Sequence, residues 1–491
     1  MSTEILSVKV IKGTMWLTVS QILGILFGTV AVIVLTRLLG PTVYGYLPLI
    51  TSLTGIGLIF GDAGLGAGTA YFVAQHRIDS SKLAKILHHA LRIRLVSVLP
   101  FLLLFAAILL LCIPFMNAPL LLDTWIFIAV LLLFLVQVLS RWIVKVFEGL
   151  GETRYSGMVQ AALGWLSPLG QVALVVAGFG LMGAVFAQLA GNSIIIILLF
   201  IVLYTKFMRF PASRTPVTTR MIVNYSLPLM LLNGTAFIYS ASGPLIVKWI
   251  GSIQDVSYYG LASQIVTISQ IPALAFASAT APVVAAEENQ NIANKIVRNG
   301  IRLLTIAYAP IVLYTAIAST KIIHLVFTES YGQTARLLCI LQPYLLASAL
   351  AAFFSLLWDY CGMARKRLVL VGAASVMFLG LAVFAGFHYG PEGVALAAVV
   401  TYLPLVACYG YFVSIKFSIE ISFYYSLWTK TLVALAPGAI VLLITSHLFS
   451  SIGVVIAMIL SGLAYLFLAF RLNLLNREDC YRIKAVTVGT K

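Results

Sequence analysis

Long apolar segments, separated by short polar or Pro- and Gly-containing stretches, recur along the whole chain. A helix rises 1.5 Å per residue, so about 20 apolar residues cross the roughly 30 Å hydrocarbon core of a membrane. Segments of about this length lie at residues 11–36, 46–74, 95–116, 124–147, 155–177, 181–205, 222–249, 257–281, 302–327, 337–361, 368–388, 391–415, 427–446 and 451–470. The pattern predicts an all-α polytopic membrane protein with about 14 transmembrane helices.

The composition supports this prediction. Hydrophobic residues make up 61% of the chain and charged residues 9%, and the mean hydropathy is +1.05. These values lie far outside the range of a soluble domain. The first apolar segment has full spanning length and lacks a small-residue cleavage site, so we expect a transmembrane helix there and not a signal peptide.

Basic residues are distributed unevenly between the two ends of the predicted helices. If the N-terminus is cytoplasmic, all but four of the 31 lysines and arginines lie in or beside cytoplasmic segments, Arg92 and Arg94 among them. The four exceptions are Arg37, Lys248, Lys321 and Arg336. Because Lys and Arg are enriched in cytoplasmic loops, we expect a multi-pass protein of the cell membrane with both termini cytoplasmic.

The charge and the cysteines exclude other classes of protein. The formal net charge of +16 reflects this topology and contact with anionic membrane lipids, so it is no evidence for nucleic-acid binding. The five cysteines are scattered and form no CxxC pair, which gives no indication of a disulfide framework or a metal site. We expect no cofactor.

The two halves of the chain share landmarks that lie about 210 residues apart. Three pairs carry the match: Arg37-Leu-Leu-Gly40 with Lys248-Trp-Ile-Gly251 at an offset of 211, Lys85-Ile86 with Lys295-Ile296 at 210, and Gly151–Arg154 with Gly362–Arg365 at 211. Such regular offsets indicate an internal duplication of six helices.

The duplication predicts the domain organisation. Six is an even number, so both copies insert with the same orientation, and we expect two six-helix lobes related by a parallel pseudo-twofold repeat. The predicted parts are an N-lobe at residues 1–208, a cytoplasmic linker at 209–221, a C-lobe at 222–418, and residues 419–491, which hold two extra C-terminal helices and a basic cytoplasmic tail. The extra helices would offer a lipid-facing groove or a partner surface. Alternatively, the duplication serves only to build a stable bundle.

Four short motifs resemble one family of membrane transporters. They are LLGPTVYG at Leu38–Gly45, GDAGL at Gly61–Leu65, FEGLGETR at Phe147–Arg154 and NYSLP at Asn224–Pro228. With them the chain resembles the oligosaccharide flippases of the polysaccharide-biosynthesis family, within the superfamily of multidrug, oligosaccharidyl-lipid and polysaccharide exporters. The resemblance implies a two-lobed alternating-access protein whose cationic central cavity moves a polyprenyl-linked sugar from the inner to the outer leaflet.

Ionisable residues at membrane depth are functional candidates, because burying a charge at the midplane costs about 2.5–3.5 kcal/mol. Asp62 lies near the middle of the second predicted helix, among glycines that permit close helix contact or a break. It is either a cavity residue that takes up a coupling ion or a buried structural partner of an arginine or a loop amide.

Arg141 and Lys145 share one face of the fourth helix. Lys145 can snorkel to the headgroups, whereas the deeper Arg141 could meet a diphosphate.

Arg37 and Lys248 occupy equivalent positions of the repeat, at the outer ends of the first and seventh predicted helices. An arginine suits bidentate phosphate contact and a lysine acts as a point charge, but anchoring at the membrane interface is an equal alternative. The substrate-binding candidates are therefore Arg37, Arg141, Lys248 and Lys145, and Asp62 is the ion-coupling candidate. Neutral polar residues that could contact sugar hydroxyls or link helices are Gln21, Gln137, Gln160, Gln171, Gln188, Asn192, Asn233, Gln264 and Gln270.

Together with these candidates, the resemblance implies a flippase that translocates a polyprenyl-diphosphate-linked oligosaccharide for cell-surface polysaccharide or glycan assembly, with membrane lipids and other glycan-assembly membrane proteins as partners. One alternative is a cation-coupled drug or metabolite antiporter, which would need several cavity carboxylates, whereas Asp62 alone is deeply placed. Another is a membrane-embedded polysaccharide polymerase or glycosyltransferase. That chemistry needs paired carboxylates or a His/Asp cluster, and each outer acid here stands alone on a short loop, so we expect no enzyme.

Overall fold

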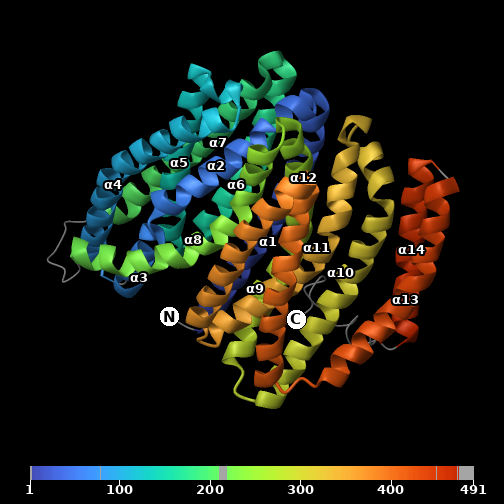
Figure 1. The fold of residues 1–491 in the computed structure, drawn as a ribbon. Coiled ribbons are helices and arrows are strands. Elements are labelled where there is room, and N and C mark those ends of the chain that lie inside the picture. The colour runs from blue at the N-terminus through green and yellow to red at the C-terminus, as the bar shows by residue number, and fades with distance from the viewer. Residues whose placement is uncertain (1–2, 78, 210–217, 449, 473, 475–491) are drawn as a thin grey trace. The chain divides into compact units, whose positions relative to one another are not determined.

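The computed structural model describes residues 3–77, 79–209, 218–448, 450–472 and 474, and within these ranges it contains helices and no strand. The α-helices are α1 (Thr3–Tyr44), α2 (Tyr46–Asp62), α3 (Leu65–His76), α4 (Ser80–Phe115), α5 (Thr124–Gly149), α6 (Thr153–Leu174), α7 (Gly180–Leu203), α8 (Thr219–Ile250), α9 (Ile253–Ala286), α10 (Gln290–Val326), α11 (Gly332–Tyr360), α12 (Ala364–Lys416), α13 (Ile421–Leu448) and α14 (Ser451–Arg471) (Figure 1). Two π-helical turns follow α6 and α7, at Val175–Phe179 and Tyr204–Met208. The expected all-helical polytopic membrane protein is confirmed.

Ten helical segments in the described part of the chain are long and apolar enough to cross a membrane, or eleven if α2 and α3 together form one broken span. Two of these segments exceed one crossing, since the segment at 164–208 has 45 residues and α12 has 53. Each contains a break at a glycine with positive φ, at Gly178 (φ 92°) and at Gly390 (φ 61°), which Pro391 follows. Both breaks fall where the hydropathy pattern separates two helices. The full count of fourteen stays a prediction.

The chain forms two compact units, residues 1–260 and 261–491. In the first unit α8 packs against α2 and α3, and α5 packs against α3 and α7. In the second unit α10 packs against α11, and the C-terminal pair α13 and α14 packs on itself and on α10. The expected linker lies largely at residues 210–217, which are outside the described residues, and the lobe boundaries from the repeat stay a prediction.

The second predicted transmembrane helix is broken in its middle. Ala63 (φ 46°) and Gly64 (φ 69°) both adopt the left-handed conformation, and α2 and α3 meet at an angle of 47°. Gly64 also lies directly against the Ser226 carbonyl of α8, where a Cβ atom would collide. A glycine is therefore required at this position both by backbone conformation and by space.

α4 begins well before the sequence pattern indicates. Asp79 caps its first turn by accepting hydrogen bonds from the backbone amides of Ser81 and Lys82, and the Lys82 amide is the main reason that the pKa of this carboxyl falls to about 2. Residues 82–94, which precede the predicted transmembrane segment at 95–116, are therefore helical as well. Its apolar stripe, which includes Leu83, Ile86, Leu87 and Ala90, packs inward as the core face of an amphipathic helix.

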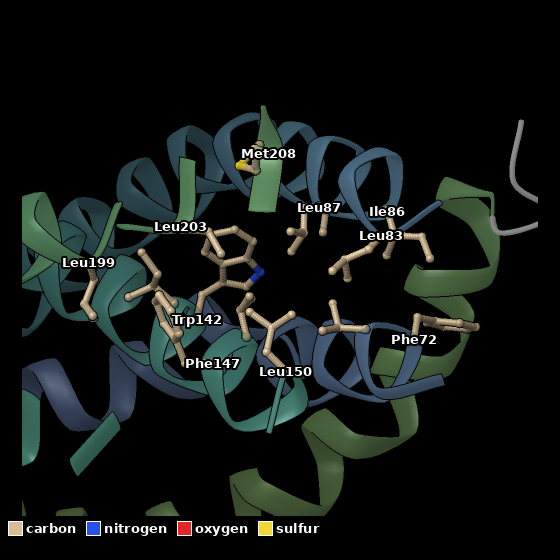
Figure 2. Close-up of a cluster of buried hydrophobic side chains, with 14 of the residues drawn as sticks. Phe72, Leu83, Ile86, Leu87, Trp142, Phe147, Leu150, Leu199, Leu203 and Met208 are labelled. Carbon is tan, nitrogen blue, oxygen red and sulfur yellow. The ribbon is translucent and has the colours of Figure 1, made fainter. Parts of the chain in front are cut away.

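That stripe belongs to a hydrophobic core built from α3, α4, α5, α7 and the start of α8. Trp142 of α5 lies among Leu87, Phe147, Leu150 and Leu203 (Figure 2), and its indole N–H donates a hydrogen bond of 3.2 Å to the Thr69 hydroxyl. Burial of such large side chains supplies most of the packing energy of this region. The core holds α5 in place next to the broken helix α2–α3.

We expect Gly64→Ala to lower the thermal unfolding midpoint of the detergent-purified protein strongly, because the new Cβ collides with α8 in addition to straining φ. Gly178→Ala is the matched control. Gly178 (φ 92°, ψ 4°) has a left-handed backbone like that of Gly64 (φ 69°, ψ 0°) but open space around it, so its substitution carries only the left-handed penalty of roughly 1–2 kcal/mol. Equal midpoints for the two variants would contradict the close contact between Gly64 and α8.

Candidate functional site

A polar cavity of about 460 Å³ lies within the first unit, among α2, α5, α6, α7 and α8. Its lining residues are Thr51, Ser52, Thr54, Gly55, Leu58, Gln137, Ser140, Arg141, Ser167, Gln188, Asn192 and Ala241. Most of them carry a hydroxyl or an amide, which is unusual for helices that cross a membrane. Polar groups at this depth are retained when they face a wet cavity or one another.

The hydroxyls of the lining are oriented by their own helices. Thr51 donates to the Leu47 carbonyl and Thr54 to the Ile50 carbonyl, each at 2.9 Å. Their protons are thus used within α2, and the oxygen lone pairs remain as hydrogen-bond acceptors. The α2 side of the cavity therefore offers acceptors to a bound ligand.

The amides on α7 add to this pattern. The Asn192 side-chain nitrogen donates to the Gln188 carbonyl at 2.7 Å, which leaves the side-chain oxygen of Asn192 as an acceptor. From α6, Ser167 accepts a hydrogen bond of 3.3 Å from the Gln171 amide. A surface with both neutral donors and acceptors suits a ligand rich in hydroxyl groups.

Arg141 of α5 supplies the one charged side chain among the described lining residues of this cavity. It interacts electrostatically with Asp62 at the end of α2. A guanidinium presents five donors in a planar fork, which matches phosphate and carboxylate oxygens. The cavity therefore combines neutral polar walls with one cationic anion-binding group.

Asp62 and Arg94 form an ion pair at the break between α2 and α3. The Arg94 Nη2 atom lies 3.6 Å from the Asp62 carboxylate, and the Arg94 side chain is 0% exposed. The same guanidinium donates to the carbonyls of Gly61 at 2.7 Å and Asp62 at 3.4 Å, and to that of Val138 in α5 at 2.6 Å. Arg94 thus caps the free carbonyls at the C-terminus of α2 and ties them to α5.

Comparisons with known proteins identify the family. The family model described as polysaccharide biosynthesis protein matches residues 10–288. The chain belongs to this family. Among solved structures, the lipid II flippase MurJ in an inward closed conformation superimposes with a TM-score of 0.72 at 14% identity, covering 94% of this chain and 98% of MurJ.

MATE transporters are similar as well. An inward-facing multidrug resistance MATE transporter of the MOP superfamily matches with a TM-score of 0.65 at 18% identity, over 82% of this chain and 98% of its own. A mutant of the Vibrio cholerae MATE transporter VcmN matches with a TM-score of 0.52 at 15% identity, over 84% and 98% of the two chains. A search of curated protein sequences finds no match. The fold of this polysaccharide biosynthesis protein is therefore that of MurJ and MATE transporters.

The other predicted binding residues of this family member lie outside the cavity lining. Lys145 pairs with Glu148 at 2.7 Å, one turn along α5. Lys248 is buried near the end of α8, where it approaches the Gly251 carbonyl at 3.5 Å and interacts with Asp255. Arg37 is exposed on α1. The structure thus brings Arg141, Asp62 and Arg94 together. The stem of Lys145 lies beside Gly66, as the Asp62 carboxylate does, whereas Arg37 and Lys248 lie in separate surroundings.

Of the neutral polar residues singled out from the sequence, Gln137, Gln188 and Asn192 line the cavity. The side chains of Gln21, Gln160 and Asn233 are outside the described residues. The sequence pattern did not indicate the serines and threonines of the lining as site residues. It also placed Arg94 in a cytoplasmic segment, whereas the structure places it at the break between α2 and α3. The signal for Arg94 was its position four residues after Ala90 on the buried stripe of α4, opposite the exposed Arg92.

An apolar groove lies in the second unit between α10 and α14, with a volume of about 520 Å³. Its lining is hydrophobic apart from Thr315 and the hydroxyls of Tyr314 and Tyr465, and it includes Pro310 and Gly462. The Tyr465 hydroxyl donates to the Ile306 carbonyl at 3.1 Å, which leaves ring carbons toward the groove side of α14. A groove of this composition suits a hydrocarbon chain.

The described residues contain no cluster of three or more His, Cys, Asp or Glu side chains that could hold a metal ion. The four cysteines within the described ranges are Cys112, Cys339, Cys361 and Cys408, and all are free thiols. The chemistry of the site is therefore carried by Arg141, its carboxylate neighbour Asp62 and the neutral polar lining.

Proposed function

We propose that this protein is a flippase that moves a polyprenyl-diphosphate-linked oligosaccharide from the cytoplasmic to the outer leaflet of the cell membrane by alternating access, for the assembly of cell-surface polysaccharide. The observation that carries this proposal is Arg141 in a cavity of neutral hydroxyls and amides, in a chain of the polysaccharide biosynthesis family. Arg141 would bind the diphosphate or another acidic group of the cargo, and the neutral lining would bind sugar hydroxyls.

The physical need for such a site is desolvation. A lipid-linked sugar cannot cross hydrocarbon alone, because its phosphates and hydroxyls would lose their hydrogen bonds to water. A polar cavity replaces part of that hydration, and Arg141 offsets the negative charge. The membrane potential adds direction, since about 2.3 kcal/mol per charge per 100 mV favours an anion leaving an inside-negative cell.

The apolar groove between α10 and α14 is proposed to hold the polyprenyl chain of the cargo. A hydrocarbon chain gains little by leaving the lipid phase, so the groove would guide the chain and not supply the affinity. The repeat-based model adds two six-helix lobes that rock about the linker at 209–221, with both termini cytoplasmic. Arg37, Lys248 and Lys145 stay substrate-binding candidates, although they lie outside the cavity lining.

Asp62 is proposed to couple transport to protons. Its carboxylate interacts with both Arg94 and Arg141, so protonation of Asp62 would free the charge of Arg141 for the cargo anion. The rival function, a cation-coupled antiporter, is disfavoured by the same geometry. A drug cation would meet Arg141 on the cavity wall, and like charges repel.

In a strain that lacks the chromosomal copy of this gene, we expect Arg141→Ala to lower surface polysaccharide at least tenfold at unchanged protein level. Arg141→Lys should give an intermediate value, because a lysine keeps the charge but loses the bidentate fork. Arg92→Ala, which removes an exposed arginine from α4, is the control. Quantitative sugar analysis of the cell surface measures the effect. Full polysaccharide with both Arg141→Ala and Arg37→Ala would remove these residues from the site.

Asp62→Asn mimics a permanently protonated acid and tests the proposed coupling. We expect export by the parent protein to fall when nigericin collapses the pH gradient, and export by the Asp62→Asn variant to be insensitive to nigericin. Surface polysaccharide is measured with and without the ionophore at matched protein level. Equal sensitivity of both proteins would exclude Asp62 as the proton carrier while leaving the flippase proposal intact.

Gly462→Leu tests the groove. Gly462 lines the groove and has open space around the position of a Cβ, so a leucine side chain would extend into the groove. We expect the thermal midpoint to stay the same or rise, and export to fall severalfold. Gly380→Leu on α12, where a Cβ also meets open space, is the control. Undiminished export by Gly462→Leu would mean that the groove takes no part in transport.

A further inference from the structure

A side chain of α10 takes part in the backbone hydrogen bonding of α9. In a continuous helix the Ala273 amide donates to the Ser269 carbonyl. Here the Ala273 amide donates to the Tyr308 hydroxyl at 3.1 Å, and that hydroxyl donates to the Ser269 carbonyl at 2.7 Å. Tyr308 is a buried residue of α10, the next helix along the chain. Its hydroxyl therefore bridges two groups of α9 that would otherwise bond to each other.

The residue that opens the ladder is Pro272. A proline inside a helix has no N–H to donate, and its ring presses on the carbonyl four residues earlier. The hydrogen bond that follows, between residues 273 and 269, spans the same distorted turn. Inserted side chains and prolines are both recognised causes of helix bending. Pro272 and Tyr308 together make this turn of α9 a place where the helix can change direction.

The break between α2 and α3 in the first unit shares one feature with this proline-containing turn, a side chain of the next helix bound to backbone groups. The carbonyls of Gly61 and Asp62 lose their helical partners at the break, and Arg94 binds both of them. Arg94 belongs to α4, which is again the helix that follows the broken one. In each unit, then, a buried polar side chain of the next helix satisfies backbone groups at an interrupted turn.

The sequence repeat relates these two turns. The offset of 211 places Gly61 on Pro272, and the offset of 210 places Arg94 on Leu304 of α10. Leu304 lies one helical turn before Tyr308, on the same face of α10. The break and the residue that bridges it therefore recur at corresponding places, although the chemical groups differ completely. Shared position with different chemistry indicates that the interrupted turn itself is the retained feature.

We propose that α2–α3 and α9 are matched hinges, each held by one side chain of the following helix, and that Arg94 and Tyr308 are the positioning residues that set the bend of these hinges. In the bridged state the side chain supplies the missing partner. When the side chain withdraws, the Ala273 amide and the Ser269 carbonyl lose this partner while Pro272 keeps the turn distorted, so the bridged and the unbridged turn are two discrete arrangements of the helix. The measurement of polysaccharide export described below rests on the proposed function, whereas the measurement of amide hydrogen exchange does not.

Tyr308→Phe removes the bridging hydroxyl and keeps the ring. Amide hydrogen exchange of the full-length protein in detergent is followed in the α9 peptide at residues 268–278. We expect exchange there to rise about tenfold, because the Ala273 amide loses its acceptor. Export measured in the deletion strain should fall at least fivefold at unchanged protein level. Tyr409→Phe is the matched control, since Tyr409 is a buried tyrosine of α12 in the same unit that packs on Trp358.

Pro272→Ala supplies the second test, which also holds if Tyr308→Phe does not accumulate. An alanine permits the continuous helix, so we expect slower exchange at Ala273 and reduced export, both alone and combined with Tyr308→Phe. In the first unit, Arg94→Lys keeps a positive charge but cannot reach three carbonyls at once. It should raise exchange in the peptide at residues 58–66, whereas Arg92→Lys should not.

The proposal is overturned if Tyr308→Phe leaves α9 exchange at the level of Tyr409→Phe. It is also overturned if exchange changes as expected but Tyr308→Phe and Pro272→Ala both export normally, since the turn would then be a static feature. Absence of any export by the parent protein would instead contradict the proposed function, and the exchange results alone would then decide whether the hinges exist.

Discussion

The buried guanidinium of Arg94 is the contact on which the first unit depends. A break in the middle of a transmembrane helix leaves carbonyls without partners, and in a region without water that cost must be met by another protein group. Arg94 meets it by binding the carbonyls of Gly61, Asp62 and Val138, while Asp62 balances its charge. Because Val138 lies on α5 beside Gln137, Ser140 and Arg141, the same contact that stabilises the break also fixes the cavity wall.

The charge of this region is arranged around one carboxylate. Asp62 interacts with two arginines, of which Arg94 is fully buried and bound to carbonyls, whereas Arg141 faces the cavity. Removing one partner of such a set leaves the other charge poorly compensated, which is costly at low dielectric. Asp62 thus offsets charge on both guanidinium groups, while the hydroxyls and amides around Arg141 add hydrogen-bonding groups without adding charge. Under the proposed function, these few side chains adapt a fold shared with MurJ and MATE transporters to an anionic, hydroxylated cargo.

Irregular backbone in the long helical segments is concentrated at a small number of turns. The positive-φ residues Ala63, Gly64, Gly178 and Gly390 mark breaks in such segments, and Pro272 lies inside α9. Large buried side chains such as Trp142 hold the surrounding segments as rigid pieces. Motion between conformations is then expected at the interruptions, because packed cores change between discrete states more easily than they deform.

The sequence by itself determined the class of protein, since apolar segments of spanning length leave no alternative to transmembrane helices, and its motifs indicated the family. It also located Arg141 and Asp62, because charges inside apolar segments stand out one residue at a time. The tertiary structure alone decided which helices face one cavity, and so why Arg141 lines it while Arg37, Lys145 and Lys248 do not. It likewise decided the roles of Arg94 and Tyr308. Both act by binding backbone groups of another helix, and hydrophobic periodicity shows which face of a helix is buried but not which carbonyl lies opposite it.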